Sequence, residues 1–145
     1  MLAESPQALA AYHAMSDQFQ QSSLLKPAQL VVRLDCQPAQ RLWLLRRGYS
    51  ALAKGEGVDD SIVEAIREDK PIDDAALEAV RVFTAIVVEQ RGWVADHDVQ
   101  AFLDNGFTQR QILDVFTGVA QKTLSNYANH LAGTPLDKAF TPFAA

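Results

Sequence analysis

The sequence predicts an all-α protein, a single-domain helical bundle of about six to seven helices over residues 1–145. Apolar residues return every three or four positions in successive segments, as they do on the buried face of a helix. Neither the alternating pattern of a half-buried strand nor an internal repeat is found in the sequence. A chain of 145 residues is long enough for one hydrophobic core, and a second domain is not expected.

The first helix is predicted to begin at Ser5-Pro6, because a capping hydroxyl there precedes a ring whose φ already suits a helix. Its buried face is expected to hold Leu9, Tyr12, His13, Met15, Ser16 and Phe19. Ser22-Ser23 ends this helix, and Pro27 begins a second one. The apolar stripe of the second helix consists of Leu30, Val31 and Leu34. Pro38 disfavours its continuation beyond Cys36.

Two helices are predicted in the next part of the chain. The first runs from Ala39 to the exit signal Lys54-Gly55. Leucines line one side of it, at positions Leu42, Leu45 and Leu52. Asp59 then caps a short helix that ends before Lys70-Pro71. Its inward residues are Ile62, Val63 and Ile66.

A long helix is predicted to begin at Asp73 or Asp74 and to stop at Gly92. The residues that recur at its helical period are Leu77, Val80, Phe83, Thr84, Val87 and Val88. A shorter helix follows over residues 96–104. It ends at Asn105-Gly106, a pair suited to positive φ. Trp43 and Trp93 are expected to be packing residues.

The last helix has the clearest start signal, because Thr108 and Gln111 form a capping-box pair. Phe107 and Ile112 are also placed for a hydrophobic staple. The apolar surface consists of Ile112, Leu113, Val115, Phe116, Val119, Leu124, Tyr127 and Leu131. It is too broad for a helix with one neighbour, so we expect part of it to contact another subunit. Residues 134–145 hold Leu136, Phe140 and Phe143 and are expected to pack as an arm.

The composition limits the partners and the chemistry that are expected. A net charge of −5 and a pI near 5.0 disfavour a nucleic-acid partner, which would need a basic face. A membrane-spanning run of about 20 apolar residues and a signal peptide are not apparent, so a cytoplasmic protein is expected. Cys36 is the one cysteine, which excludes an intrachain disulfide, and His13, His97 and His130 are too scattered for a metal triad. No cofactor is expected.

Several pieces of the sequence, in the same order and over nearly the whole chain, resemble one family of proteins. They are Ser22-Ser23-Leu24-Leu25-Lys26-Pro27, Val31-Val32-Arg33-Leu34, Ser50-Ala51-Leu52-Ala53-Lys54-Gly55, Arg91-Gly92, Leu124-Ser125-Asn126-Tyr127-Ala128-Asn129-His130 and Thr134-Pro135-Leu136-Asp137. The family is the alkylhydroperoxidase D-like or carboxymuconolactone decarboxylase superfamily, in its peroxidase-related branch. The resemblance implies an all-helical fold, a homo-oligomer such as a trimer or hexamer, and reduction of hydroperoxides with a thiol reductant as partner.

The motif of this branch, Cys-x-x-Cys-x-x-x-His at the start of a helix, is absent from the sequence. In the register of the resemblance, Leu42 and Leu45 occupy the two cysteine positions and Tyr49 occupies the histidine position. Leu30 stands where many relatives have a proton-relay glutamate. The chemistry needs a thiolate, which a helix N-terminus and a histidine stabilise, and a second thiol that closes a disulfide. The sequence as written is therefore predicted to lack dithiol peroxidase activity.

Cys36 and His130 are the remaining candidates for chemistry. Cys36 lies six residues before the first motif position, so it does not replace either cysteine, and a small apolar packing role is favoured over a one-cysteine peroxidase. His130 ends a polar run on an apolar helix. A structural hydrogen bond is favoured for it over a role in a pocket. Two alternatives to the peroxidase stay open: a non-catalytic oligomeric relative, and a lactone-decarboxylase type of enzyme that needs no cysteine.

The resemblance stops abruptly after Leu34 and resumes at Ser50 without a change in length, which suggests a compensated shift of reading frame. If Asp35 to Gly48 is back-translated and read one base forward, suitable wobble bases allow Thr-Ala-Ser-Arg-Leu-Asn-Asp-Cys-Gly-Tyr-Cys-Val-Ala-Gly. Loss of one base from a Gly-His codon pair then gives Tyr49. The restored protein would carry Leu42→Cys, Leu45→Cys and Tyr49→His, whereas Leu30 is unaffected. The sequence alone leaves open whether the segment is a genuine divergence or a sequence error.

Overall fold

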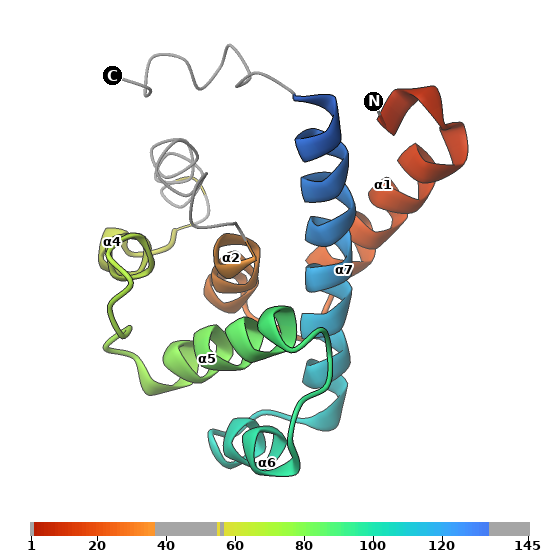
Figure 1. Ribbon diagram of the computed structural model, residues 1–145. Helices are drawn as coiled ribbons and strands as arrows, with labels where there is room; N and C mark the ends of the chain where they lie inside the picture. Colours follow the sequence, from red (N-terminus) through yellow and green to blue (C-terminus); the bar gives the residue numbers. More distant parts are fainter. Residues whose placement is uncertain (1, 37–54, 56, 134–145) are drawn as a thin grey trace.

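The structure, a computed structural model, describes residues 2–36, 55 and 57–133. All the regular elements in these residues are helices, and none of these residues forms a strand (Figure 1). In chain order they are the 3-10 helix η1 (Leu2–Glu4) and the α-helices α1 (Pro6–Gln20), α2 (Lys26–Asp35), α4 (Asp60–Arg67), α5 (Ala75–Glu89), α6 (Asp96–Asp104) and α7 (Gln109–Ala132). The predicted all-α class is confirmed.

The helix α2 lies at the centre of the bundle, between α5, α7 and α4 (Figure 1). Its residues Leu30, Val31 and Leu34 are buried as predicted, and Val32 on the opposite side is buried too. A helix that is buried on most of its sides needs neighbours around most of its circumference. Burial of each of these side chains contributes about 1.5–3 kcal/mol, so α2 is a main source of the stability of the fold.

The remaining core residues come from the helices around α2. Phe19 from α1, Val80 and Phe83 from α5, Phe102 from α6 and Val115 from α7 are all at most 2% exposed. Phe83 stacks on Phe102 with ring centroids 4.4 Å apart, which joins α6 to α5. The bundle therefore has one contiguous core that all the longer described helices share.

Side-chain caps fix the starts of four helices at the residues that the sequence predicts. The Ser5 hydroxyl accepts a bond from Ala8 N, and the Asp59 and Asp74 carboxylates accept bonds from Ser61 N and Leu77 N. At α7 the capping box is complete, because Thr108 Oγ1 accepts from Gln111 N and Gln111 Oε1 accepts from Thr108 N. These bonds pair N–H groups that have no partner within the helix.

The first two turns of α7 also hold the turn between α1 and α2. The amide and the hydroxyl of Ser23 both donate to Asp114 Oδ2, at 3.1 and 2.5 Å. Gln111 Nε2 donates in turn to Ser23 O at 3.3 Å. Two segments 91 residues apart in the chain are therefore joined by three hydrogen bonds.

Gly118 of α7 lies in close contact with side chains of α1 and α2. A Cβ atom at this position would lie 2.7 Å from Phe19 Cε2 and 2.8 Å from Val32 Cγ1. Side chains do not tolerate such distances, so only glycine allows the three helices to pack at this spacing. The close packing explains why Phe19 and Val32 are almost completely buried.

Some predicted details are wrong. His13 is exposed and Phe19 is the one fully buried residue of α1, because α1 packs mainly against α7 and leaves its other sides in solvent. Trp93 is 87% exposed and is not a packing residue, since it follows the end of α5. By contrast, the predicted helix over 96–104 and its end at Asn105-Gly106 are confirmed, and within this pair Gly106 takes the positive φ.

Four large apolar residues of α7 are exposed, at positions Leu113, Phe116, Tyr127 and Leu131. Leu113 and Leu131 are separated by five helical turns, so they lie on the same face about 27 Å apart. In the part of the chain that the structure describes, half of the apolar surface predicted for this helix is thus exposed. A second subunit on this face stays a prediction.

Two predicted segments, the helix from Ala39 to Gly55 and the C-terminal arm over 134–145, lie outside the described residues or almost entirely so. Among the helices that the structure describes, none combines the length and the apolar character needed to cross a membrane.

Candidate functional site

A cavity of about 580 Å³ lies where the ends of α2 and α5 meet α7. Its apolar wall consists of Val87, Val88, Phe116, Val119 and Ala120. Among the described residues its polar side chains are Asp35, Arg91, Thr123, Asn126, Tyr127 and His130, and Cys36 and Gly92 line it too. An apolar cavity with a few converging polar groups is the usual form of a small-molecule site.

The helix α7 contributes more of the lining than any other element. Its lining residues lie three or four positions apart, from Phe116 through Thr123 to His130, and therefore share one face of the helix. The wall becomes more polar along this face, from the phenyl ring of Phe116 to the imidazole of His130. The cavity thus has an apolar end and a polar end along α7.

A hydrogen bond fixes the end of α2 against this face. Asn126 Nδ2 donates to Cys36 O at 3.0 Å. Cys36 is the C-cap residue directly after α2, and the last carbonyl groups at a helix end have no partner within the helix. Asn126 therefore pairs one of them and holds residues 35 and 36 at the cavity.

Cys36 lies in this wall as a neutral thiol. Its residue is 8% exposed, and burial raises its pKa to about 12, with a smaller contribution from the charge of Asp35. A thiol with such a pKa holds almost no thiolate at neutral pH and is a poor nucleophile. This agrees with the interpretation of Cys36 as a small apolar packing residue.

Asp35, the last residue of α2, is a partly buried acid in an unfavourable place. Its Oδ2 atom is buried and has no hydrogen-bond partner. Burial raises its pKa from 3.8 to about 6, Arg81 opposes this shift, and the nearby charges of Asp69 and Glu78 add to it. The C-terminus of a helix also disfavours a negative charge.

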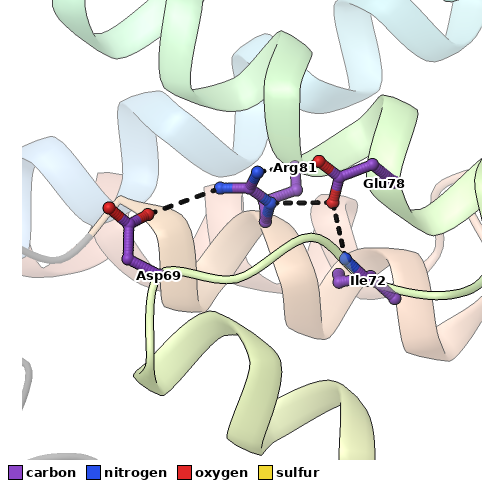
Figure 2. A network of polar contacts seen from close by, with 4 residues as sticks. All are labelled: Asp69, Ile72, Glu78 and Arg81. Carbon is purple, nitrogen blue, oxygen red and sulfur yellow. Dashed lines mark hydrogen bonds and ion pairs between the residues drawn. The ribbon is translucent and has the colours of Figure 1, made fainter.

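The guanidinium of Arg81 compensates Asp35 only in part, because other carboxylates hold it (Figure 2). The Glu78 carboxylate accepts two hydrogen bonds from Arg81, at 2.7 and 2.8 Å. Asp69 Oδ1 lies 3.7 Å from Arg81 Nη1. Glu78 Oε2 also accepts from Ile72 N at 2.8 Å. The hydrogen bonds from Arg81 are the main reason why the pKa of Glu78 is lowered.

Of the residues singled out in the sequence, His130 is brought to the cavity and Leu30 is not. Leu30 is 1% exposed and packs in the core, so the relay position is a core position in this chain. Leu42, Leu45 and Tyr49 lie outside the described residues. His97 is exposed and next to Asp98, and the described residues contain no cluster suited to a metal ion.

Sequence reasoning missed two charged residues of the site, Asp35 and Arg91. Arg91 was noted only as part of a pair with Gly92, and Asp35 only as a point where the resemblance ends. Arg91 has a φ of +54°, a left-handed value that is costly for a residue with a Cβ. The Arg-Gly pair at a helix end was the available signal, but Gly92 was interpreted only as the stop of the helix.

The comparison with protein-family models gives no match for this sequence, and the comparison with curated proteins gives none either.

Proposed function

We propose that the chain is an alkylhydroperoxidase D-like protein, of the branch that reduces hydroperoxides with a cysteine pair, and that it forms a homo-oligomer. One observation carries the proposal. The cavity is lined by Asn126, Tyr127 and His130, which belong to the resembling run, and by Cys36, which directly precedes the segment with the motif positions. The all-α class and the uncovered apolar face of α7 support the same assignment.

In the proposed chemistry, a thiolate attacks the O–O bond of a hydroperoxide, which gives a sulfenic acid and an alcohol. The second thiol then closes a disulfide and releases water, and a dithiol reductant restores both thiols. The chain as written has leucine at both sulfur positions, Leu42 and Leu45. Cys36 does not substitute for them, because its pKa is raised to about 12 and its side chain is buried. The polypeptide as written is therefore inactive.

The absent motif is explained by a local shift of reading frame between Asp35 and Tyr49. The restored segment would begin with Asp35→Thr and Cys36→Ala. The first of these replacements fits the described packing better than the residue written, because Asp35 has a buried carboxylate oxygen without a partner and an elevated pKa. A neutral threonine or alanine at the end of α2 has no such penalty. The misfit thus starts at the residue where the resemblance stops.

A peroxide-consumption assay with a dithiol reductant tests the proposal on two proteins. One is the chain as written, and the other carries the restored segment over residues 35–49. Turnover is expected in the restored protein alone, and replacing either restored cysteine by serine should abolish it. If the restored protein folds and consumes no peroxide, the proposal is wrong. If the chain as written turns over peroxide and Cys36→Ser stops it, a one-cysteine mechanism replaces the proposed one.

A second candidate function, a lactone-decarboxylase type of enzyme, is favoured by one observation. The cavity contains an acid whose pKa is raised to about 6, Asp35, and an imidazole, His130, and such groups serve proton transfer near neutral pH. Release of carbon dioxide from a carboxylated lactone by the chain as written, lost in both Asp35→Asn and His130→Gln, would support it. Under this alternative the written sequence is genuine.

A further inference from the structure

We propose that the cavity between α2, α5 and α7 binds an amphipathic monocarboxylate, with its carboxylate on Arg91 and its apolar body against Val87, Val88, Phe116 and Val119. This inference rests on the proposed function only in taking the same cavity as the ligand site, and it needs no thiol chemistry. Three properties of the site lead to it: a strained backbone, an available cation and an apolar wall.

The strain lies at the end of α5. Gly92 N donates to Val87 O at 2.9 Å, and Arg91 N donates to Val88 O at 3.4 Å, which is the bond pattern of a Schellman ending. In this pattern the residue before the last donor takes a left-handed conformation, and glycine is the usual residue there. Here that residue is Arg91, with a φ of +54°. Glycine would be less strained, so a stability argument does not account for an arginine.

The cation is available to a ligand. Arg91 is exposed and lines the cavity, and among the described residues no carboxylate forms an ion pair with its guanidinium. By contrast, the guanidinium of Arg81 on α5 forms ion pairs with Glu78 and Asp69 (Figure 2). A guanidinium presents parallel donors that match a carboxylate.

The apolar wall and the opposite charge define the rest of the ligand. Val87, Val88, Phe116 and Val119 offer a surface for an alkyl or aromatic body, and a cavity of about 580 Å³ is in the usual range for a small organic ligand. Asp35 lines the same cavity from α2, so a second negative charge on the ligand would be repelled. This favours a monoanion over a dianion.

The test is a calorimetric titration of the chain as written with decanoate, and with decanol as the uncharged probe. We expect saturable binding of decanoate, and binding of decanol that is about tenfold weaker. Arg91→Gln should weaken the binding of decanoate about tenfold and leave the binding of decanol unchanged, whereas Arg91→Lys should retain part of the preference. Arg110→Gln, which removes an exposed cation outside the cavity, is the control and should bind like the parent.

Arg91→Gly separates binding from folding. Since glycine suits the left-handed conformation, this variant should melt at a temperature equal to or above that of the parent and still lose the preference for decanoate. The proposal is overturned by the absence of saturable decanoate binding, by equal affinity in Arg91→Gln, or by a lower melting temperature of Arg91→Gly. None of these outcomes affects the peroxidase assay of the restored protein, so the two proposals fail independently.

Discussion

The Asn126 side chain and the Cys36 carbonyl are joined by a hydrogen bond of 3.0 Å that links the last helix to the end of the central one. The bond spans 90 residues of sequence. It lies in the wall of the cavity, since both residues line it. This amide group therefore helps to hold the end of α2 against α7 at the candidate site.

Asn126→Ala should lower the free energy of unfolding by about 1 kcal/mol, because a partly buried hydrogen bond is lost and the Cys36 carbonyl loses its partner. Denaturant unfolding monitored by circular dichroism measures the change. Asn129→Ala, an exposed position one turn further along α7, is the control and should change the stability by less than about 0.5 kcal/mol. Equal effects of the two substitutions would contradict the role of this bond.

Gly118→Ala should destabilise the fold by about 1–2 kcal/mol. The added methyl group meets Phe19 and Val32 at distances of 2.7 and 2.8 Å, and the cost of overpacking exceeds the gain in helix propensity of about 1 kcal/mol. In a double-mutant cycle with Phe19→Leu, the second substitution should relieve part of the clash. The two effects would then be less than additive. Strict additivity would show that the ring of Phe19 is not what the methyl group meets.

Asp35→Asn should stabilise the protein at pH 7.5 and change it little at pH 4. The pKa of Asp35 is raised in the folded protein from 3.8 to about 6, so the folded state binds the proton more tightly than the unfolded state. The resulting stabilisation is fully present below about pH 4 and is lost as the pH rises through 6, by up to about 3 kcal/mol.

The measurement for Asp35 is the difference in unfolding free energy between the parent and Asp35→Asn across this pH range. Glu78→Gln is the opposite control. Its pKa is lowered in the folded protein, chiefly by the bonds from Arg81, so the parent gains stability as the pH rises above the folded pKa, and the variant loses that gain. A difference for Asp35→Asn that does not vary between pH 4 and 7.5 would refute the assignment.

The double substitution Leu113→Glu and Leu131→Glu should convert the proposed homo-oligomer into monomers. Both leucines are exposed, at 63% and 77%, and lie on one face of α7, so two charges there would be buried in any interface that uses this face. Light scattering at micromolar concentration gives the mass. Leu25→Glu, which alters a leucine that is equally exposed but lies outside α7, should leave the oligomer intact. A monomeric parent protein would end this prediction.

The starts of the helices were predictable from the sequence because capping is local. Ser5, Asp59, Asp74 and Thr108 each bond an amide two or three positions further along the chain, so residue type and spacing are sufficient signals. The apolar stripe of α2 was also predictable, because the helical spacing of its apolar residues is a local signal. The exposure of His13 was not, because it depends on how far α7 covers α1.

The cavity could not be predicted from spacing, because it is assembled from three distant segments. Asp35, Arg91 and Asn126 approach one another only after α2, α5 and α7 have packed. The resemblance did draw attention to His130, although it favoured a structural role for that residue. The burial of Asp35 had no local signal at all, since an acid at the end of a helix is ordinarily expected in solvent.

The bonds from Ser23 to Asp114 have a consequence for synthesis of the protein on the ribosome. The turn between α1 and α2 is secured by residues made 91 positions later, and Phe19 packs beside Gly118 of the same late helix. At bacterial to eukaryotic elongation rates the nascent chain spends roughly 5 to 20 seconds with the α1 side of its core uncovered. During this interval Phe19, the one fully buried residue of α1, lacks the helix that covers it in the folded protein.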